Sequence, residues 1–180
     1  MLVFIGASAS GKTEIVKILI RDYGFNKIIT HTTRKKRKNE IDGIDYHFLS
    51  LTEFLSRKDE NYFIETEKYD GNYYGTAFKD TGINNVLIVD PNGANSIYEK
   101  GIKNAVYIYL ETSESVRESR MEFRGDASLD IHQRVINDRN HFSIKSINHI
   151  DHIIITDSYS LEELADMINK IYKEDLKEEE

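Results

Sequence analysis

The sequence predicts an α/β fold in which a central parallel sheet lies between layers of helices. Short, continuously apolar runs recur along the chain, as expected for strands that are buried on both faces of a sheet. These runs are residues 2–5, 86–89, 105–110 and 153–155. A helical segment follows each run, and this alternation predicts parallel strands joined by right-handed crossovers. Ligands of such sheets gather at the carboxyl ends of the strands, where we therefore expect the functional site.

Length and composition fit a single domain. The chain has 180 residues, 39% of them hydrophobic, and contains no Pro-, Gly- or Ser-rich tract that would act as a linker. Its net charge of -7 predicts repulsion from nucleic acid and from anionic lipid. No apolar stretch is long enough to span a membrane, no charged and hydrophobic leader precedes Leu2, and cysteine is absent. These features favour a protein of the cytoplasm.

The N-terminal part of the chain predicts strand, loop, helix and strand. Residues 2–5 form the first strand, and a glycine-containing loop follows it. From Thr13 the apolar residues recur with a helical period, and Gly24 is placed to end this helix. Residues 25–30 predict the second strand. Residues 32–45 are polar, charged and without periodicity, which indicates a loop or small subdomain.

The next segment has an antiparallel character. Ser50 and Glu53 form a capping-box pattern for a short helix through Leu55. Two alternating strands and the tight turn between them follow: residues 62–69, 73–77 and 70–72. We therefore expect residues 34–81 to be inserted into the parallel sheet as a mixed α/β lobe.

The last predicted helix begins after Ser160, where Glu163 completes a second capping box. Its apolar residues share one face, as packing against a sheet requires. They are Leu161, Leu164, Met167, Ile168 and Ile171. The acidic tail, residues 173–180, is expected to be the fraying end of this helix.

A glycine-rich stretch, GASASGKT, lies between the first strand and the first helix. Its spacing is that of the Walker A motif, or P-loop, in which glycines and a helix start let backbone N–H groups face an anion. Lys12 is expected to neutralise the terminal phosphates of a nucleotide, and Thr13 to offer a hydroxyl to Mg²⁺. The motif predicts a three-layer P-loop NTPase fold that binds ATP, and a plain Gly/Ser turn is the alternative. The predicted nucleotide-binding residues are Gly6, Ala7, Ser8, Ala9, Ser10, Gly11, Lys12 and Thr13.

A basic run, RKKRK at residues 34–38, is an exception in this acidic chain. Arginine forks suit the bidentate capture of phosphate oxygens, so Arg34 and Arg37, with Tyr46 close behind, are candidates for a second phosphate site. The acidic residues that follow distinguish the stretch from a simple polybasic tail. By itself, however, the run also fits a solvated surface or a nucleic-acid patch.

At this point the chain resembles the guanylate kinases, a family of P-loop nucleoside monophosphate kinases. The similarity is carried by five segments in the family's order: GASASGKT, TTRKKRKNEIDGIDYHFLS, FIETEKYDGNYYGTA, LIVDPNGA and RMEFRGDASLDIHQR. The resemblance implies one domain over residues 1–180, with an NMP-binding lobe at residues 34–81 and a small helical lid at residues 119–137. The core would then comprise residues 1–33, 82–118 and 138–180.

The resemblance also implies an acceptor site for GMP. Glu40 would help to fix the arginines among the residues that hold its phosphate, which are Arg34, Arg37, Tyr46 and Tyr74. The residues that read the base would be Thr30, Glu65, Thr76 and Asp90. Such a set suits guanine because carboxylates accept from its N1 and N2 donors and a hydroxyl donates to O6. Adenine would leave a buried carboxylate facing a lone pair, so it would be rejected strongly.

Other interpretations of these residues stay open. Glu65 could be an alternating strand residue that faces water, and Asp90 could be a helix cap. Tyr73 and Tyr74 could simply pack within the hairpin.

Arginines around Gly125 complete the implied site. In the family the corresponding residues close over the ATP phosphates, where aligned positive charge and exclusion of water favour phosphoryl transfer. The implied catalytic set is Lys12, Arg37, Arg120, Arg124 and Arg134. The alternative is that the lid arginines are surface residues paired with neighbouring acids, namely Glu118, Glu122 and Asp130.

The chain departs from the family pattern at several positions. Ile88 stands where the family has an acidic residue that helps to organise Mg²⁺, so metal handling would rest on Thr13, water and the phosphates. Lys36 and Asn39 replace a proline and a glycine in the phosphate-holding loop, and the lid is one residue short. Thr156 stands where an asparagine often contacts adenine.

The sequence therefore predicts a cytoplasmic enzyme of purine nucleotide metabolism that transfers the γ-phosphoryl group of ATP, with Mg²⁺, to GMP and dGMP by in-line displacement. The expected partners are these small nucleotides, neither nucleic acid nor membrane, and the protein would be a monomer or homodimer. One alternative is a related kinase for another phosphorylated acceptor such as ribose bisphosphate, which would not need Glu65 and Asp90 together. The other is a guanylate-kinase-like module that binds peptides without catalysis.

Overall fold

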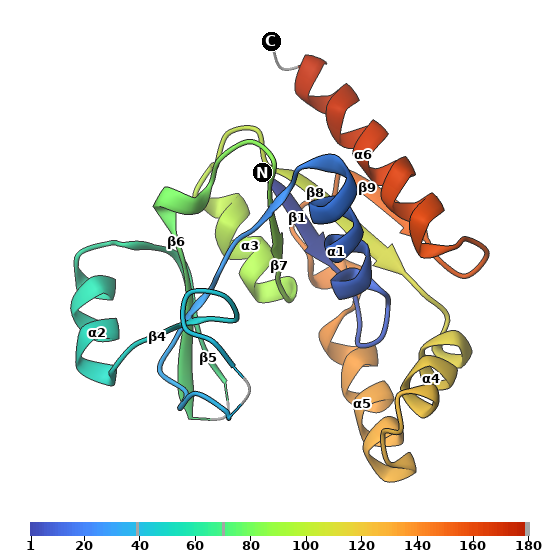
Figure 1. Cartoon of the computed structure of the whole chain (residues 1–180), viewed down its shortest axis with the longest axis horizontal. Coiled ribbons are helices and arrows are strands. Elements are labelled where there is room, and N and C mark those ends of the chain that lie inside the picture. The colour runs from blue at the N-terminus through green and yellow to red at the C-terminus, as the bar shows by residue number, and fades with distance from the viewer. Residues whose placement is uncertain (39, 70, 179–180) are drawn as a thin grey trace.

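The computed structural model describes residues 1–38, 40–69 and 71–178. Figure 1 shows a core that contains both ends of the described chain, a lobe to its left and a pair of helices at its lower right. Asn39 and Asp70, which the sequence analysis placed in the phosphate-holding loop and in the hairpin turn, lie outside the described residues.

Five parallel strands form the core sheet, in the order β2-β7-β1-β8-β9. Their bounds are β1 Leu2–Ile5, β2 Asn26–Lys27, β7 Asn85–Ile88, β8 Val106–Glu111 and β9 His152–Ile155. The first strand lies in the middle and is fully buried, so its carboxyl end opens toward the centre of the molecule. The predicted α/β fold with a central parallel sheet is confirmed.

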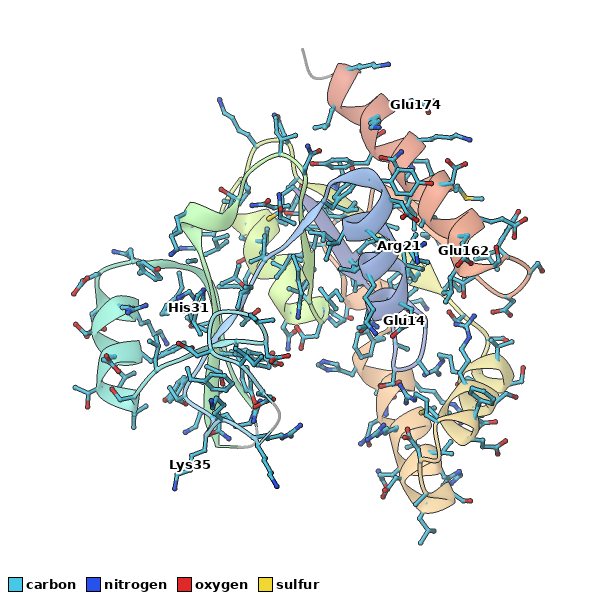
Figure 2. All side chains as sticks on the ribbon, viewed as in Figure 1. Glu14, Arg21, His31, Lys35, Glu162 and Glu174 are labelled. Carbon is cyan, nitrogen blue, oxygen red and sulfur yellow. The ribbon has the colours of Figure 1, made fainter. Side chains whose placement is uncertain are left out.

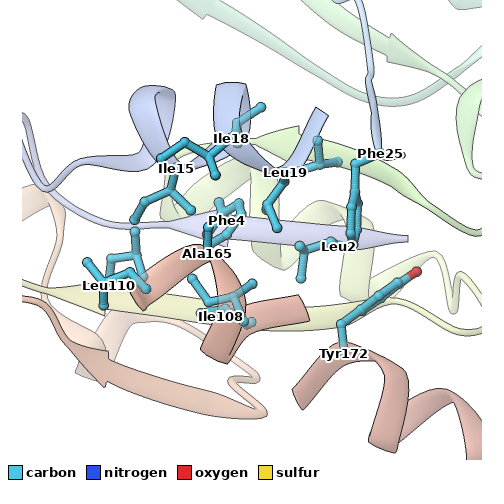
Figure 3. Close-up of a cluster of buried hydrophobic side chains, with 14 of the residues drawn as sticks. Leu2, Phe4, Ile15, Ile18, Leu19, Phe25, Ile108, Leu110, Ala165 and Tyr172 are labelled. Carbon is cyan, nitrogen blue, oxygen red and sulfur yellow. The ribbon is translucent and has the colours of Figure 1, made fainter. Parts of the chain in front are cut away.

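Helices cover both faces of the core sheet. The core helices are α1 (Lys12–Tyr23), α3 (Pro91–Glu99) and α6 (Leu161–Glu178). On one face, Phe4 and Ile108 of the strands pack with Leu19 of α1 and Ala165 of α6 (Figure 3). On the other face, the alternate strand residues pack with α3. The burial of both faces explains why these strands are continuously apolar in sequence.

Local sequence signals set the helix ends. Gly24 ends α1 with a φ of 73°, a left-handed conformation that glycine adopts at little cost. Ser50 and Glu53 cap each other's backbone at the start of α2 (Leu51–Asp59), as the capping box predicts. The helix predicted to stop at Leu55 continues to Asp59, because the capping signal fixes only the start. Residues 173–178 stay within α6, while 179 and 180 lie outside the described part.

A second sheet, with the order β4-β3-β6-β5, forms the lobe. Its strands are β3 His31–Thr32, β4 His47–Phe48, β5 Phe63–Tyr69 and β6 Asn72–Ala77. The long strands β5 and β6 pair as the predicted antiparallel hairpin. A short 3₁₀ turn, Phe78–Asp80, leads the chain back to the core.

The predicted strand over residues 25–30 is wrong in one respect, because the chain changes sheets there. Asn26 and Lys27 pair with β7 of the core, and Ile28 still donates its N–H to the Val86 carbonyl at 2.9 Å. Thr30 then leads into β3, which pairs with the lobe strands β4 and β6. Phe25 and Ile28 are buried as core strand residues are, so their pattern alone cannot show where the pairing partner changes.

Two helices, α4 (Glu114–Phe123) and α5 (Ser128–His141), form the lower right part of Figure 1. Both extend beyond the predicted lid at residues 119–137. A small apolar cluster holds them together, and Ala9 of the P-loop packs against it; its buried members are Met121, Ile131 and Val135. A 3₁₀ turn, Ile144–Ser146, follows α5. Within the described residues, none of the helices combines the length and the apolar character needed to cross a membrane.

Candidate functional site

The P-loop connects the carboxyl end of β1 to the start of α1. A Cβ atom at Gly6 would lie 2.8 Å from the backbone oxygen of Leu110 on β8, so the close approach of the loop to the sheet requires glycine. Gly11 precedes α1 with a φ of 98°, which side chains rarely allow. The loop therefore presents its backbone at a helix N-terminus, an arrangement suited to binding phosphate.

The Lys12 side chain folds back over the loop. Its Nζ donates to the backbone oxygens of Gly6 and Ala7, at 2.8 Å for Ala7, and to Ser10 Oγ at 3.1 Å. Burial lowers the pKa of Lys12 to about 8, although the nearby Asp138 carboxylate acts in the opposite direction. The charged nitrogen of the motif thus lies against the anion-binding loop, where it can exchange these oxygens for those of a phosphate.

A cavity of about 700 Å³ lies beside the P-loop, and we call it the donor cavity. It is large enough for a nucleotide. Its lining comes from the P-loop, the start of α1, one side of α4 and the first residue of α6. The lining residues are 9–14, Ser115, Val116, Ser119, Arg120, Phe123, Arg124 and Leu161. Thr13 is therefore placed in the same cavity as Lys12.

The arginines predicted for the lid occupy different places. Arg120 lines the donor cavity and donates to the backbone oxygen of Ala9 at 3.1 Å. Arg124 also lines it, but its guanidinium pairs with Asp126 at 2.8 Å. Arg134 pairs with the same carboxylate at 3.0 Å and is not among the residues described as lining the cavity. The acid that holds these two arginines is thus Asp126, which the sequence analysis did not consider.

A second cavity, of about 180 Å³, lies between the lobe sheet and the start of α3, and we call it the acceptor cavity. Most of the residues predicted to bind the acceptor line it together: Thr30, Tyr46, Glu65, Tyr74, Thr76 and Asp90. The remaining lining residues are Glu67, Ile88, Val89 and Gly93. Because these residues come from separate segments of the chain, only the fold brings their carboxylates and hydroxyls to one place.

Glu65 and Thr76 face each other across the β5–β6 hairpin. Thr76 Oγ1 donates to Glu65 Oε1 at 2.7 Å. Burial raises the pKa of Glu65 to about 7, and the nearby charge of Asp90 acts in the same direction. Glu65 is therefore a half-buried carboxyl group within the cavity, not a strand residue facing water.

Asp90 serves two purposes. It caps α3, since Asp90 Oδ1 accepts from the backbone N–H of Gly93 at 2.8 Å, while its carboxyl group also lines the acceptor cavity. Its other oxygen lies 2.9 Å from Nε2 of His141 at the end of α5. The helix-cap and base-reading interpretations of Asp90 are thus compatible.

The acceptor cavity contains a carboxyl group that the sequence analysis missed. Glu67 lines it, and burial together with the charge of Asp90 raises the pKa of Glu67. Its position two residues after Glu65 on the same strand face was a usable signal, because strand side chains alternate between faces. No such signal pointed to His141, because it lies 51 residues after Asp90 in the sequence and only the fold brings the two together.

Glu40 organises the loop that contains the basic run. Its carboxylate accepts from the Arg34 guanidinium at 2.6 Å and from the backbone N–H of Arg37 at 2.8 Å. The Arg34 guanidinium also lies 5.4 Å from the ring centre of Tyr46. Arg37 and the lysines of the basic run are exposed, and Lys35 points away from the lobe in Figure 2. The run therefore combines one fixed arginine with a solvated surface.

The structure shows where two residues that depart from the family pattern lie. Ile88 lines the acceptor cavity and packs against the core, so the end of β7 is apolar there. Thr156 is fully buried, and its Oγ1 lies 2.6 Å from Thr112 Oγ1. Thr156 is not among the described residues that line the donor cavity.

Comparisons with known proteins show the family to which the chain belongs. A family model described as guanylate kinase matches residues 1–174. The guanylate kinase of Blochmanniella floridana is 34% identical over 166 residues, which cover 86% of this chain and 77% of that protein. The guanylate kinase of Syntrophus aciditrophicus (strain SB) is 31% identical over 182 residues, which cover 96% of this chain and 84% of that protein.

The fold is also similar to that of a solved structure. The crystal structure of guanylate kinase from Anaplasma phagocytophilum matches with a TM-score of 0.64 and covers 97% of this chain and 85% of that one. At 24% sequence identity this likeness concerns the fold alone.

Proposed function

The chain belongs to the guanylate kinase family, and we propose that its two cavities hold the donor and the acceptor of one phosphoryl transfer. The protein is an enzyme that phosphorylates GMP to GDP with ATP as the phosphate donor. In the proposal, ATP occupies the donor cavity, GMP occupies the acceptor cavity, and the γ-phosphoryl group passes between them in line.

The chemistry of the acceptor cavity is the observation that carries this proposal. Glu65 and Asp90 offer carboxylate oxygens to the N1 and N2 donors of guanine, while the hydroxyls of Thr30 and Thr76 suit its O6. Adenine has an acceptor at N1 and would leave a carboxylate without a donor, which costs binding energy. Ribose bisphosphate lacks the adjacent N–H donors of guanine and would not need both carboxylates together, so the cavity favours a guanine nucleotide over that acceptor.

The phosphate of GMP would bind at the lobe side of the same cavity. Tyr46 and Tyr74 line that side, and Arg34 stands against the Tyr46 ring with its guanidinium held by Glu40. Arg37 is exposed on the same loop and would turn toward the phosphate as the lobe closes. The Arg34 fork is thus oriented before substrate arrives, which reduces the cost of binding.

On the donor side, P-loop N–H groups and Lys12 would hold the ATP phosphates. Arg120 already lines the cavity, whereas Arg124 and Arg134 would have to exchange Asp126 for phosphate oxygens. We propose that residues 34–81 and 119–137 move as a lobe and a lid that close on the core. Closure would gather positive charge around the transferred group and exclude water.

Magnesium fits this chain as a partner of the nucleotide. Thr13 offers one hydroxyl oxygen in the donor cavity, a ligand type that Mg²⁺ accepts. No cluster of three or more His, Cys, Asp or Glu side chains placed to hold a metal occurs in the described part of the chain, and position 88 is apolar. Bound Mg²⁺ would neutralise phosphate charge, with Thr13, water and the phosphates as its ligands.

The finer properties stay predictions. Phosphorylation of dGMP follows if the base and phosphate contacts dominate acceptor binding, since none of the proposed contacts involves the 2′-hydroxyl. The cytoplasmic location and a monomeric or homodimeric state are likewise predictions from the sequence.

A direct assay tests the proposal. ADP release from Mg·ATP is measured with GMP, dGMP, AMP, UMP and ribose bisphosphate as acceptors at matched concentrations. We expect turnover with GMP and dGMP and a kcat/KM for AMP that is lower by roughly 100-fold or more, because buried polar groups reject a mismatched base. Turnover of AMP or ribose bisphosphate at a rate comparable to GMP would contradict the proposed acceptor site.

A further inference from the structure

A buried ion pair lies at the base of the two lid helices. Arg117 of α4 and Asp138 of α5 pair at 2.7 Å, and their side chains are 4% and 9% exposed. Asp138 directly follows the segment 119–137 that we assign to the lid, and Arg117 lies two residues before that segment. The ion pair therefore joins the two ends of the lid to each other.

The same pair is hydrogen-bonded to Ser8 of the P-loop. The backbone N–H of Ser8 donates to Asp138 Oδ2 at 2.9 Å, and its hydroxyl lies 3.3 Å from Asp138 Oδ1. Arg117 approaches the Ser8 carbonyl oxygen at 3.4 Å. The backbone of one P-loop residue is thus held on both its N–H and its C=O side by residues of the lid helices.

Stability alone does not account for this arrangement. A buried ion pair gives little net stabilisation compared with a well-packed apolar pair of the same size, because both charges lose their hydration. Asp138 also places a negative charge beside a loop that must bind a triphosphate, and Arg117 offsets that charge. What an apolar pair could not supply is an acceptor for the Ser8 N–H and a partner for its carbonyl.

We propose that Arg117 and Asp138 are positioning residues that fix the shape of the P-loop and join it to the base of the lid. This inference rests on the proposed function, in which the P-loop binds the ATP phosphates. Arg120 lies one helical turn after Arg117 and donates to Ala9, the residue that follows Ser8. By holding Ser8, the pair would place Arg120 and the P-loop amides around the same phosphates before the lid closes.

The chain offers a matched control pair on the same two helices. Arg139, the neighbour of Asp138, makes two hydrogen bonds to Glu114 of α4, at 2.6 and 2.7 Å. This pair also links α4 to α5, but it is largely exposed, and both of its hydrogen bonds lie within the two helices. Replacing it removes an ion pair between the same two helices and leaves the contacts of Ser8 in place.

The test separates positioning from stability with two variants of the full chain. Arg117→Met/Asp138→Leu replaces both charges by apolar side chains, so its thermal midpoint should stay close to that of the parent. Its KM for ATP should rise roughly tenfold, because Ser8 loses a charge-assisted hydrogen bond, while the KM for GMP stays within about twofold. Asp138→Asn keeps an oxygen that can accept from Ser8, so its KM for ATP should remain near the parent value although its thermal midpoint falls.

The control Glu114→Gln/Arg139→Met should keep the parent KM for both substrates. The inference is overturned if the double variant at positions 117 and 138 binds ATP like the parent, or if both KM values rise together with lost stability. Calorimetric titration with Mg²⁺ and a non-hydrolysable ATP analogue, without GMP, measures nucleotide affinity at the P-loop independently of turnover. A parent protein that binds the analogue but does not phosphorylate GMP would refute the proposed function. The analogue affinities of the parent and the variants would still test the role of Arg117 and Asp138.

Discussion

The donor and acceptor cavities are built in different ways. The anion-binding part proposed for the donor side is a run of consecutive residues, 6–13, whose backbone and one ammonium group lie beside a cavity that α4 and Leu161 complete. The acceptor side is formed by side chains from separate segments, so Thr30 meets Asp90 only in the folded protein. A backbone cradle binds phosphate whatever base it carries, whereas a cavity of carboxylates and hydroxyls distinguishes one base from another. The rate should therefore depend most on the donor side, and substrate choice on the acceptor side.

Removal of the Lys12 ammonium should lower the rate through the donor side alone, and we expect it to have the largest effect. Lys12→Met keeps an unbranched apolar chain but no charge to stabilise the transferred phosphoryl group, so kcat should fall roughly 10²- to 10³-fold. The affinity for GMP should not change, because Lys12 is not among the described residues that line the acceptor cavity. Steady-state rates and a calorimetric titration with GMP measure the two quantities. Equal losses of kcat and of GMP affinity would show that the two cavities are not independent.

Truncation of Glu65 should give the reverse pattern with a smaller effect. Glu65→Ala removes the carboxylate that we assign to the guanine donors, so GMP should bind more weakly by about 1.5–3 kcal/mol, the usual scale for a charged hydrogen bond. The KM for ATP serves as the internal control and should stay near the parent value. A variant that binds GMP as well as the parent would rule out Glu65 as a base-reading residue.

The two cavities also differ in how far the sequence predicts them. The P-loop is contiguous and its spacing is specific, so residues 6–13 could be placed at a strand end and a helix start from sequence alone. The capping boxes at Ser50 and Ser160 predicted helix starts for the same reason, since both partners of each capping hydrogen bond lie within four consecutive residues. The acceptor residues, by contrast, were predicted through resemblance to a family, because no spacing joins Thr30 to Glu65 or Asp90.

What the sequence could not show are contacts that depend on the packing of distant elements. Asp138 reaches Ser8 only because α5 lies beside the P-loop, and nothing near either residue indicates it. The end of the strand predicted over residues 25–30 was wrong for the same reason, since the change from the core sheet to the lobe sheet depends on pairing partners. Asp126 likewise holds Arg124 and Arg134 through the geometry of the α4–α5 connection.

The pH dependence of kcat/KM should also differ between the two cavities, and we expect this effect to be the smallest. Burial raises the pKa of Glu65 to about 7 and lowers the pKa of Lys12 to about 8. In the proposed site GMP needs the ionised carboxylate, so kcat/KM for GMP should fall as the pH drops below about 7. ATP in turn would need the charged ammonium, so kcat/KM for ATP should fall as the pH rises above about 8. Each of these two protein groups should contribute no more than about tenfold per pH unit, the limit for a single proton.

Matched variants identify which group causes each limb. The phosphates of both nucleotides also titrate, with a second pKa near about 6, so part of the acid limb belongs to the substrates. Glu65→Gln cannot ionise and should retain only that part of the acid limb for GMP. Lys12→Arg stays charged throughout and should lose the alkaline limb for ATP while keeping the acid limb for GMP. If either variant instead altered the limb of the other substrate, proton binding in one cavity would be coupled to the other, and the two sites could not be treated as separate.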